Sequence, residues 1–289
     1  MASLMRPPGW VPTVLTAALD GDLVQLNRML AQGADPNQMD NISGYTALLY
    51  AVSKGHVDCV ARLLEAGANV NYGNAAGWTP LNLAASTLRR SADMCRLLLA
   101  GGAQVDFDPS GLRSAGSPLH YAIQNANLPA IRVLLAAGAD PNNRKGHSST
   151  QNRSPLASAV GKITVHVPRR SKIPTLLLRA GASINDPEVT AFFQNLNDPQ
   201  GHLDPHKRKA IAYLRAVHAA GSFPAYEKGH RSMFAALFSR GNRLPADVIP
   251  KIVEYWAHLG YYQYQIPGTG GTGSGTGSRK SNLPVGTRN

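Results

Sequence analysis

The sequence predicts an all-α solenoid of stacked helix pairs, and a recurring small-residue turn is the main observation behind this prediction. The turn begins at five glycines that are 34, 35, 36 and 43 residues apart: Gly33, Gly67, Gly102, Gly138 and Gly181. A period of this length holds one helix pair and a turn. Such a pair has an apolar face that it cannot bury alone, so successive pairs must stack on one another.

Each unit is expected to contain the same elements in the same order. In the third unit Thr79-Pro80 begins the first helix, because the hydroxyl accepts a hydrogen bond from a free amide and proline presets φ. Thr46, Ser117 and Ser154 occupy the same place in the units around it. Alanines keep the first helix thin, leucine pairs fill the second, and the glycine permits the left-handed turn that ends the pair.

These residues resemble the ankyrin repeat, whose pattern is G-x-T-P-L-H-x-A-A, then G-H, an apolar helix and a closing G-A-D-x-N. The resemblance covers five repeats in residues 13–185, and it implies an ankyrin-repeat solenoid with β-hairpin-like fingers. The first repeat lacks its opening hairpin, as an amino-terminal cap would. The third repeat has extra residues around Arg89-Arg90, and the fourth and fifth have long fingers near 108–115 and 143–153.

The rest of the chain divides by composition. Residues 1–12 form an amino-terminal extension, and residues 186–222 keep enough second-helix spacing, from Tyr213 to Gly221, for a degenerate sixth repeat. Two apolar helices are expected in residues 223–264 as a carboxy-terminal cap that closes the stack. Residues 265–289 are rich in Gly, Ser and Thr and are expected to form a flexible, disordered tail.

Composition restricts the possible environments of the protein. Apolar residues make up 43% of the chain, which is enough for a core, and no apolar run has the length of a signal peptide or a membrane span. The two cysteines, Cys59 and Cys95, lie in apolar helical segments without disulfide or metal-ligand spacing. We therefore expect a monomeric, intracellular protein of the cytoplasm or nucleus that does not contact membranes.

The net charge of +12 arises in the carboxy-terminal half, where residues 151–289 contain 18 Lys and Arg against 7 Asp and Glu. Clustered cations suit an acidic partner or nucleic acid. They can equally form a solvated basic surface. The fifth repeat also has an insertion that predicts a basic loop containing Arg169, Arg170 and Lys172, which is either a contact element or a tolerated surface insertion.

No motif predicts catalysis, a cofactor or a metal site. The glycine-rich tail lacks the flanking strand and helix of a phosphate-binding loop. His202 and His206 flank Asp204-Pro205, which favours a surface turn over a metal-binding helix. His56 and His120 stand where the ankyrin pattern has histidine, so the resemblance implies a structural role in which they connect helix ends with neighbouring loops.

Protein binding is the function that the resemblance implies. In similar proteins, partners lie along the finger tips and the exposed side of the first helices. The positions that correspond here are Tyr45, Ser53, Lys54, Trp78, Ser86, Thr87, Arg113, Gln124, Asn125, Arg144 and Lys145. Aromatic side chains often dominate interface energies, so Tyr45 and Trp78 are the expected anchors, although both could instead shield neighbouring hairpins.

The sequence leaves two alternatives to a non-catalytic interaction scaffold. The segment that begins at Leu244-Pro245 and continues through an apolar helix to Trp256 resembles the end of a suppressor-of-cytokine-signalling box or the start of an F-box. That resemblance implies a substrate receptor of a cullin-type ubiquitin ligase. The basic carboxy-terminal half indicates a binder of nucleic acid or acidic partners.

Overall fold

A computed structural model describes residues 13–106, 116–144, 153–162, 170, 172–195 and 205–229. The chain divides into two compact units, Met1–Asn242 and Arg243–Asn289, and all described residues belong to the first. The amino-terminal extension, most of the expected carboxy-terminal cap, the segment that begins at Leu244 and the tail therefore lie outside the described residues.

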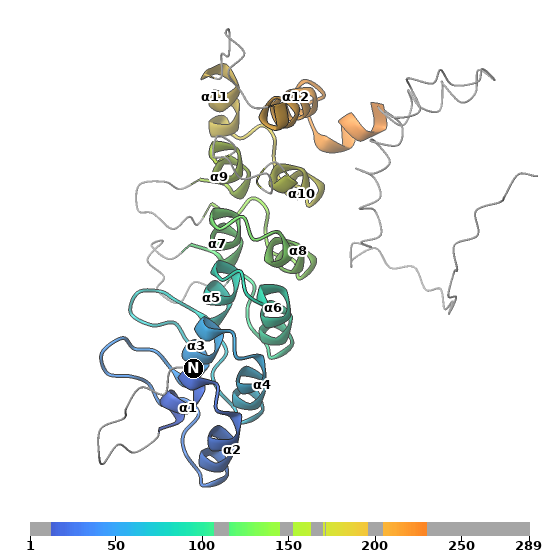
Figure 1. Cartoon of the computed structure of the whole chain (residues 1–289). Coiled ribbons are helices and arrows are strands. Elements are labelled where there is room, and N and C mark those ends of the chain that lie inside the picture. The colour runs from blue at the N-terminus through green and yellow to red at the C-terminus, as the bar shows by residue number, and fades with distance from the viewer. Residues whose placement is uncertain are drawn as a thin grey trace, which may run out of the picture. The chain divides into compact units, whose positions relative to one another are not determined.

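The described part of the chain consists of helices that are paired in chain order. Odd-numbered helices form one column and even-numbered helices form a second column beside it (Figure 1). Neighbours within the first column contact one another from α1 to α11, and α2, α4, α6 and α8 do so within the second. This arrangement confirms the predicted all-α solenoid. The helices are α1 (Val14–Asp20), α2 (Leu23–Ala31), α3 (Ala47–Lys54), α4 (Val57–Glu65), α5 (Pro80–Ser86), α6 (Ser91–Ala100), α7 (Pro118–Gln124), α8 (Leu128–Ala136), α9 (Pro155–Gly161), α10 (Ile173–Arg179), α11 (Pro187–Asn195) and α12 (Pro205–Ala219).

The odd-numbered helices are called the inner helices below. Hydroxyl side chains begin most of them as expected. Thr46, Thr79 and Ser154 accept hydrogen bonds from the amides three residues later, at 3.3, 3.1 and 3.1 Å. Thr13 does the same for α1 and forms a full capping box with Thr16. The expectation is wrong for Ser117, whose side chain makes no cap hydrogen bond. Its Oγ instead lies 2.9 Å from Nδ1 of His120.

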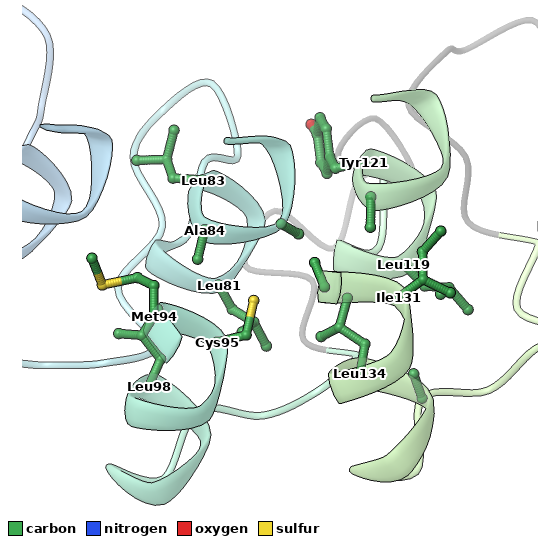
Figure 2. Packing of buried hydrophobic residues seen from close by; sticks show 14 of the residues in the cluster. Leu81, Leu83, Ala84, Met94, Cys95, Leu98, Leu119, Tyr121, Ile131 and Leu134 are labelled. Atoms are coloured by element: carbon green, nitrogen blue, oxygen red, sulfur yellow. The ribbon is translucent and has the colours of Figure 1, made fainter. Parts of the chain in front are cut away.

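The core lies between successive helix pairs. Leu81 and Cys95 of the third repeat point toward the fourth, from which Leu134 points back toward them (Figure 2), and all three are almost completely buried. Each buried leucine contributes about 1.5–3 kcal/mol to folding. Because both sides of an inner pair are covered by its neighbours, stability depends on the stack and not on any single repeat.

Asparagines in the closing turns connect each repeat to the next. Asn71 donates from Nδ2 to the carbonyl of Gly102 at 3.2 Å and accepts from the amide of Gln104 at 2.8 Å. Asn37 and Asn142 make the same two bonds to the repeats that follow them. This series of bonds, the asparagine ladder, holds the closing turns at one spacing along the array.

The ladder extends beyond the fifth repeat. Asn185 donates from Nδ2 to the carbonyl of Gly221 at 3.3 Å, and Gly221 has a φ of 78° like the closing glycines before it. After that turn, residues 223–229 are helical, and Tyr226 packs edge-on against Tyr213 of α12 with ring centroids 5.5 Å apart. The unit formed by α11 and α12 is therefore joined to the array by the donor bond of the ladder.

The fingers contain little regular hydrogen bonding in the described part of the chain. One isolated antiparallel bridge joins Met39 and Thr46, and none of the described residues forms a strand. In the first finger, Asp40 donates its amide to the Tyr45 carbonyl at 2.8 Å and accepts from the Gly44 amide at 2.9 Å. These fingers are hairpin-like turns and not extended ribbons.

Candidate functional site

The inner helices end in a row of side chains that point away from the core. Counted from the capping hydroxyl, the seventh and eighth residues occupy equivalent places in repeats two to five, and most of them are half-buried or exposed while the preceding turns are buried. We call this row the inner edge; it consists of Ser53, Lys54, Ser86, Thr87, Gln124, Asn125, Gly161 and Lys162.

Polar groups of the inner edge are fixed by bonds to their own helix. Ser86 and Thr87 donate their hydroxyls to the carbonyls of Leu83 and Ala84, at 2.9 and 3.2 Å. Ser53 and Asn125 bond in the same way to carbonyls in their own last turns. Each of these carbonyls lies three or four residues before the side chain that bonds to it, so the bonds hold the side chains in fixed orientations.

Tyr45 and Trp78 immediately precede the inner helices and are half-buried. The Trp78 ring lies 4.6 Å from that of Tyr121 on the next inner helix, and Tyr45 lies 5.2 Å from Tyr50. Both rings also pack against the hydrophobic core. Trp78 therefore contacts the next repeat and Tyr45 contacts a helix of its own repeat, and both side chains remain partly exposed.

The first finger has a feature that the sequence analysis missed. Ile42 at its tip is 97% exposed, the highest value among the exposed large apolar side chains of the described residues. Its amide donates to Oδ1 of Asp40 at 2.9 Å, so the turn that presents it is held in place. A locally polar sequence, Asp40-Asn41-Ile42-Ser43, gives no periodic signal that would reveal an exposed isoleucine.

Asp40 organises this finger. Its carboxylate accepts hydrogen bonds from the Ser43 hydroxyl at 2.6 Å and from the Tyr50 hydroxyl at 2.9 Å, so it ties the finger tip to α3. These bonds, the Ser43 hydroxyl foremost, lower the pKa of Asp40 to about 2. The finger is consequently locked by an ionised carboxylate at any physiological pH.

Arg144, one of the expected partner-binding residues, is engaged within the chain. Its guanidinium contacts the carboxylates of Asp186 at 3.0 Å and Glu188 at 3.6 Å. Arg153 contacts the same Glu188 at 2.8 Å. This ion cluster joins the finger of the fifth repeat to the start of α11. Arg144 therefore has a structural role in addition to any contact with a partner.

The insertion of the fifth repeat was expected to carry three cations, and the structure describes two of them, Arg170 and Lys172. Arg170 is directed inward and donates from Nη2 to the carbonyl of Gln124 at 3.1 Å. Lys172 is exposed and immediately precedes α10. Arg169, together with the expected contact residues Arg113 and Lys145, lies outside the described residues.

The described residues contain no group of three or more His, Cys, Asp or Glu side chains that could hold a metal. Cys59 and Cys95 are both buried, and burial raises the pKa of the Cys95 thiol to about 12, far from a reactive thiolate. None of the helices in the described ranges is long and apolar enough to cross a membrane.

The two histidines have the structural role that the resemblance implied. Nε2 of His56 lies 3.1 Å from the carbonyl of Leu19 in the preceding repeat. His120 lies between Ser117 and the backbone of Arg153 in the following repeat. Both therefore bridge helix ends and adjacent segments, and in His120 both ring nitrogens are engaged.

Comparison with known proteins agrees with this architecture. A family model described as ankyrin repeats, in three copies, matches residues 14–109, and a single ankyrin repeat model matches residues 117–146. The ankyrin repeat protein nuc-2 of Neurospora crassa is 27% identical over 72% of this chain. The mouse B-cell lymphoma 3 protein homolog is 33% identical over 48% of it. The chain spans 19% and 28% of these two relatives, respectively.

A solved structure gives the same result for the fold. The crystal structure of the human ASB11 ankyrin repeat domain superimposes with a TM-score of 0.54 at 26% sequence identity, covering 72% of this chain and 84% of that one. The helix pairs, the closing turns and these matches lead to one conclusion: the chain belongs to the ankyrin repeat family.

Proposed function

We propose that the protein is a non-catalytic scaffold that binds another protein along the inner edge and the finger tips. Ankyrin repeats generally mediate protein–protein interaction. The observation that carries the proposal is the inner edge itself, where side chains at equivalent positions vary in chemistry but project from one continuous, rigid array. A surface of this kind can recognise an extended partner through several neighbouring repeats.

Rigidity supports this function energetically. Binding costs free energy when loops and side chains must be ordered, so a preformed surface keeps more of the contact energy as affinity. Here the asparagine ladder spaces the repeats, Asp40 locks the first finger, and Ser86 is bonded to its own helix. The partner therefore meets groups that are already in place.

The proposed anchors differ in how completely they are available. Tyr45 and Trp78 are half-buried, whereas Ile42 is almost wholly exposed at a fixed tip. Burying an isoleucine side chain contributes about 1.5–3 kcal/mol. We propose Ile42 as a further anchor, with Ser53, Lys54, Thr87, Gln124 and Asn125 supplying polar contacts along the inner edge.

The remaining features fit a monomeric protein of the cytoplasm or nucleus. Both cysteines are free thiols buried in the core, which suits a reducing compartment. Light scattering of the purified chain tests the oligomeric state, and imaging of the tagged chain in its native cell tests the compartment. A dimer or a secreted protein would contradict this part of the proposal.

The central experiment blocks the inner edge without disturbing the core. Partners are first isolated from the native cell with the full chain, and their affinities are then measured for Ser53→Arg and Ser86→Arg. A bulky side chain at either position should weaken binding at least about tenfold by obstructing close contact. Ala136→Arg adds the same charge and bulk at an exposed position of α8 and should leave affinity unchanged.

Equal loss of affinity in all three variants would show that charge, and not the inner edge, governs binding. Unchanged affinity in the two inner-edge variants would remove this surface from the proposal. The free energy of unfolding of each variant, measured in urea, separates a blocked surface from a destabilised array.

A further inference from the structure

Arg170 contains buried nitrogen atoms that lack hydrogen-bond acceptors. Its Nη2 bonds to the Gln124 carbonyl, but Nε and Nη1 are shielded from solvent and have no acceptor. A guanidinium is permanently charged and carries five N–H donors, three of which belong to these two atoms. Leaving charged donors buried and unsatisfied is costly, so the arrangement calls for an anion.

Lys162 provides a second cation at the same place. It ends α9, and its pKa lies below the usual 10.5 because of partial burial and because of the positive charge of Arg170. Among the described residues, no carboxylate forms an ion pair with either side chain. Of the acidic groups on the adjoining elements, Asp186 and Glu188 are already paired with Arg144 and Arg153.

We propose that Lys162 and Arg170 form a binding site for a carboxylate side chain of an acidic segment in the protein partner. Gln124 ends α7 and Lys162 follows α9, so the site lies on the inner edge between the fourth and fifth repeats. The carboxylate supplies a counter-ion for the ammonium group. Because Nε and Nη1 are covered in the free chain, it becomes their acceptor only when binding displaces the groups that cover them. This inference rests on the proposed function, because it assigns one part of the partner's footprint.

Capping of α7 by Arg170 does not account for these observations. A positive group near the last carbonyls of a helix is favourable, and the Nη2 bond to Gln124 serves that purpose. The cap uses one nitrogen and leaves the other two without acceptors. It also gives no reason for a second cation, Lys162, to lie close enough for its protonation to be disfavoured.

The surroundings favour an acidic peptide over nucleic acid. A nucleic-acid surface needs cations repeated along the path of the phosphates. The described inner edge instead continues from this site through the neutral polar groups Asn125, Gln124, Thr87, Ser86 and Ser53, and its one further cation, Lys54, lies in the second repeat. One isolated pair of cations beside neutral hydrogen-bonding groups matches a peptide with a single well-placed Glu or Asp.

The test compares the labelled peptide Gly-Ser-Glu-Glu-Glu-Ser-Gly with its Gln counterpart, using fluorescence anisotropy and the full chain. The wild type should bind the Glu peptide at least about tenfold more tightly. Arg170→Gln should remove this preference, because it removes a charge-assisted hydrogen bond. Lys162→Met should reduce it about fivefold.

Two variants serve as matched controls. Lys172→Gln removes the neighbouring exposed cation, and Lys228→Met makes the same change as Lys162→Met at an exposed lysine outside the inner edge. Each should change the preference by less than about twofold. If Arg170→Gln fails to fold, Lys162→Met still decides the outcome.

NMR titration of Lys162 gives a local readout. The Glu peptide should raise the pKa of Lys162, because a neighbouring carboxylate favours the ammonium form, and the Gln peptide should leave it unchanged. Equal losses in the controls, no preference for Glu, no change at Lys162, or tighter binding of a single-stranded oligonucleotide than of the Glu peptide would each overturn the site. None of these results touches the Ser53 and Ser86 test, so the scaffold proposal stands or falls separately.

Discussion

His120 connects the fourth and fifth repeats through the backbone of Arg153, whose carbonyl oxygen lies 3.0 Å from Nε2 of the imidazole. A carbonyl can only accept, so Nε2 carries the hydrogen of the neutral ring. Nδ1 then accepts from the Ser117 hydroxyl at 2.9 Å. The hydroxyl that was expected to cap α7 therefore orients a buried histidine instead.

This arrangement predicts that acid weakens the array. Burial lowers the pKa of His120 below its usual 6.5, so the unfolded chain binds this proton more readily than the folded chain. The contribution of His120 to stability is complete above pH 6.5 and decreases as the pH falls below it. In His120→Gln, the free energy of unfolding in urea should decrease less between pH 7.5 and 5.5 than in the wild type.

Identical pH dependence in the two proteins would contradict this assignment. Carboxylates titrate mainly below pH 5, so the chosen interval isolates the histidine contribution. The comparison uses slopes and not absolute stabilities, because His120→Gln also alters two hydrogen bonds.

Asn127 replaces the histidine that the ankyrin pattern places before the second helix, and it should be a strong stabiliser of the third and fourth repeats. Its Nδ2 donates to the carbonyls of Ala85 and Thr87, at 3.0 and 2.6 Å, and its Oδ1 accepts from the Ser91 hydroxyl at 2.9 Å. Asn127→Ala leaves these buried partners unsatisfied and should lower the free energy of unfolding by about 2–3 kcal/mol. Urea denaturation measures the change.

Asn125 supplies the matched control for Asn127. It is exposed and makes one side-chain hydrogen bond, to the Tyr121 carbonyl in its own helix. Asn125→Ala should cost less than about 0.5 kcal/mol. If Asn125→Ala and Asn127→Ala lowered the free energy of unfolding equally, the buried hydrogen bonds of Asn127 would contribute no extra stability.

Local sequence determined the repeating elements well. Thr46, Thr79 and Ser154 begin helices as predicted, because capping depends on an amide three residues away. The closing glycines also adopt the expected left-handed turn, with Gly67 at a φ of 84°. These features need no information from distant parts of the chain.

Features that depend on a distant partner could not be predicted in the same way. Arg144 pairs with Asp186, which lies 42 residues later, and nothing in either local segment indicates the contact. Ala126 adopts a φ of 52° where the second repeat has Gly55, because the buried bonds of Asn127 hold the turn. The candidate surface was therefore predicted in outline, while the engagement of Arg144, the inward direction of Arg170 and the exposure of Ile42 required the fold.

In the asparagine ladder, the donor bond and the acceptor bond of each asparagine should contribute separately to the free energy of unfolding. Asn71→Asp keeps the oxygen that accepts from Gln104 but loses the amide that donates to Gly102, and it should cost about 1 kcal/mol. Asn71→Ala loses both bonds and should cost about 2 kcal/mol. Asp106 occupies the same place in the next repeat and accepts from the Asp140 amide at 2.9 Å, which shows that the carboxylate geometry is compatible with the array.

Equal stability of Asn71→Asp and Asn71→Ala would mean that the acceptor bond contributes nothing. Hydrogen exchange at the Gln104 amide provides a local check, since only the alanine variant should lose its protection.

In the first finger, we expect the order of the tip around Ile42 to affect affinity for the partner. Asp40→Ala removes the acceptor for the Ile42 amide and for the hydroxyls of Ser43 and Tyr50, so the tip should become mobile while the helices remain intact. Hydrogen exchange at Ile42 should accelerate at least about tenfold, and partner affinity should fall because the finger must be ordered on binding. Ile42→Ser should weaken binding through lost apolar contact without changing exchange at Ser43.

Acid provides an independent route to the same loosened finger. Because the pKa of Asp40 is lowered to about 2, its stabilising effect is present above the ordinary value of 3.8 and is lost as the pH falls toward 2. Exchange rates at Ile42, corrected for the intrinsic effect of pH, should therefore rise only below about pH 4 in the wild type and stay constant in Asp40→Ala. Loss of affinity in Ile42→Ser with no loss in Asp40→Ala would show that the partner needs the isoleucine but not a preformed finger, since mobility would then carry no cost.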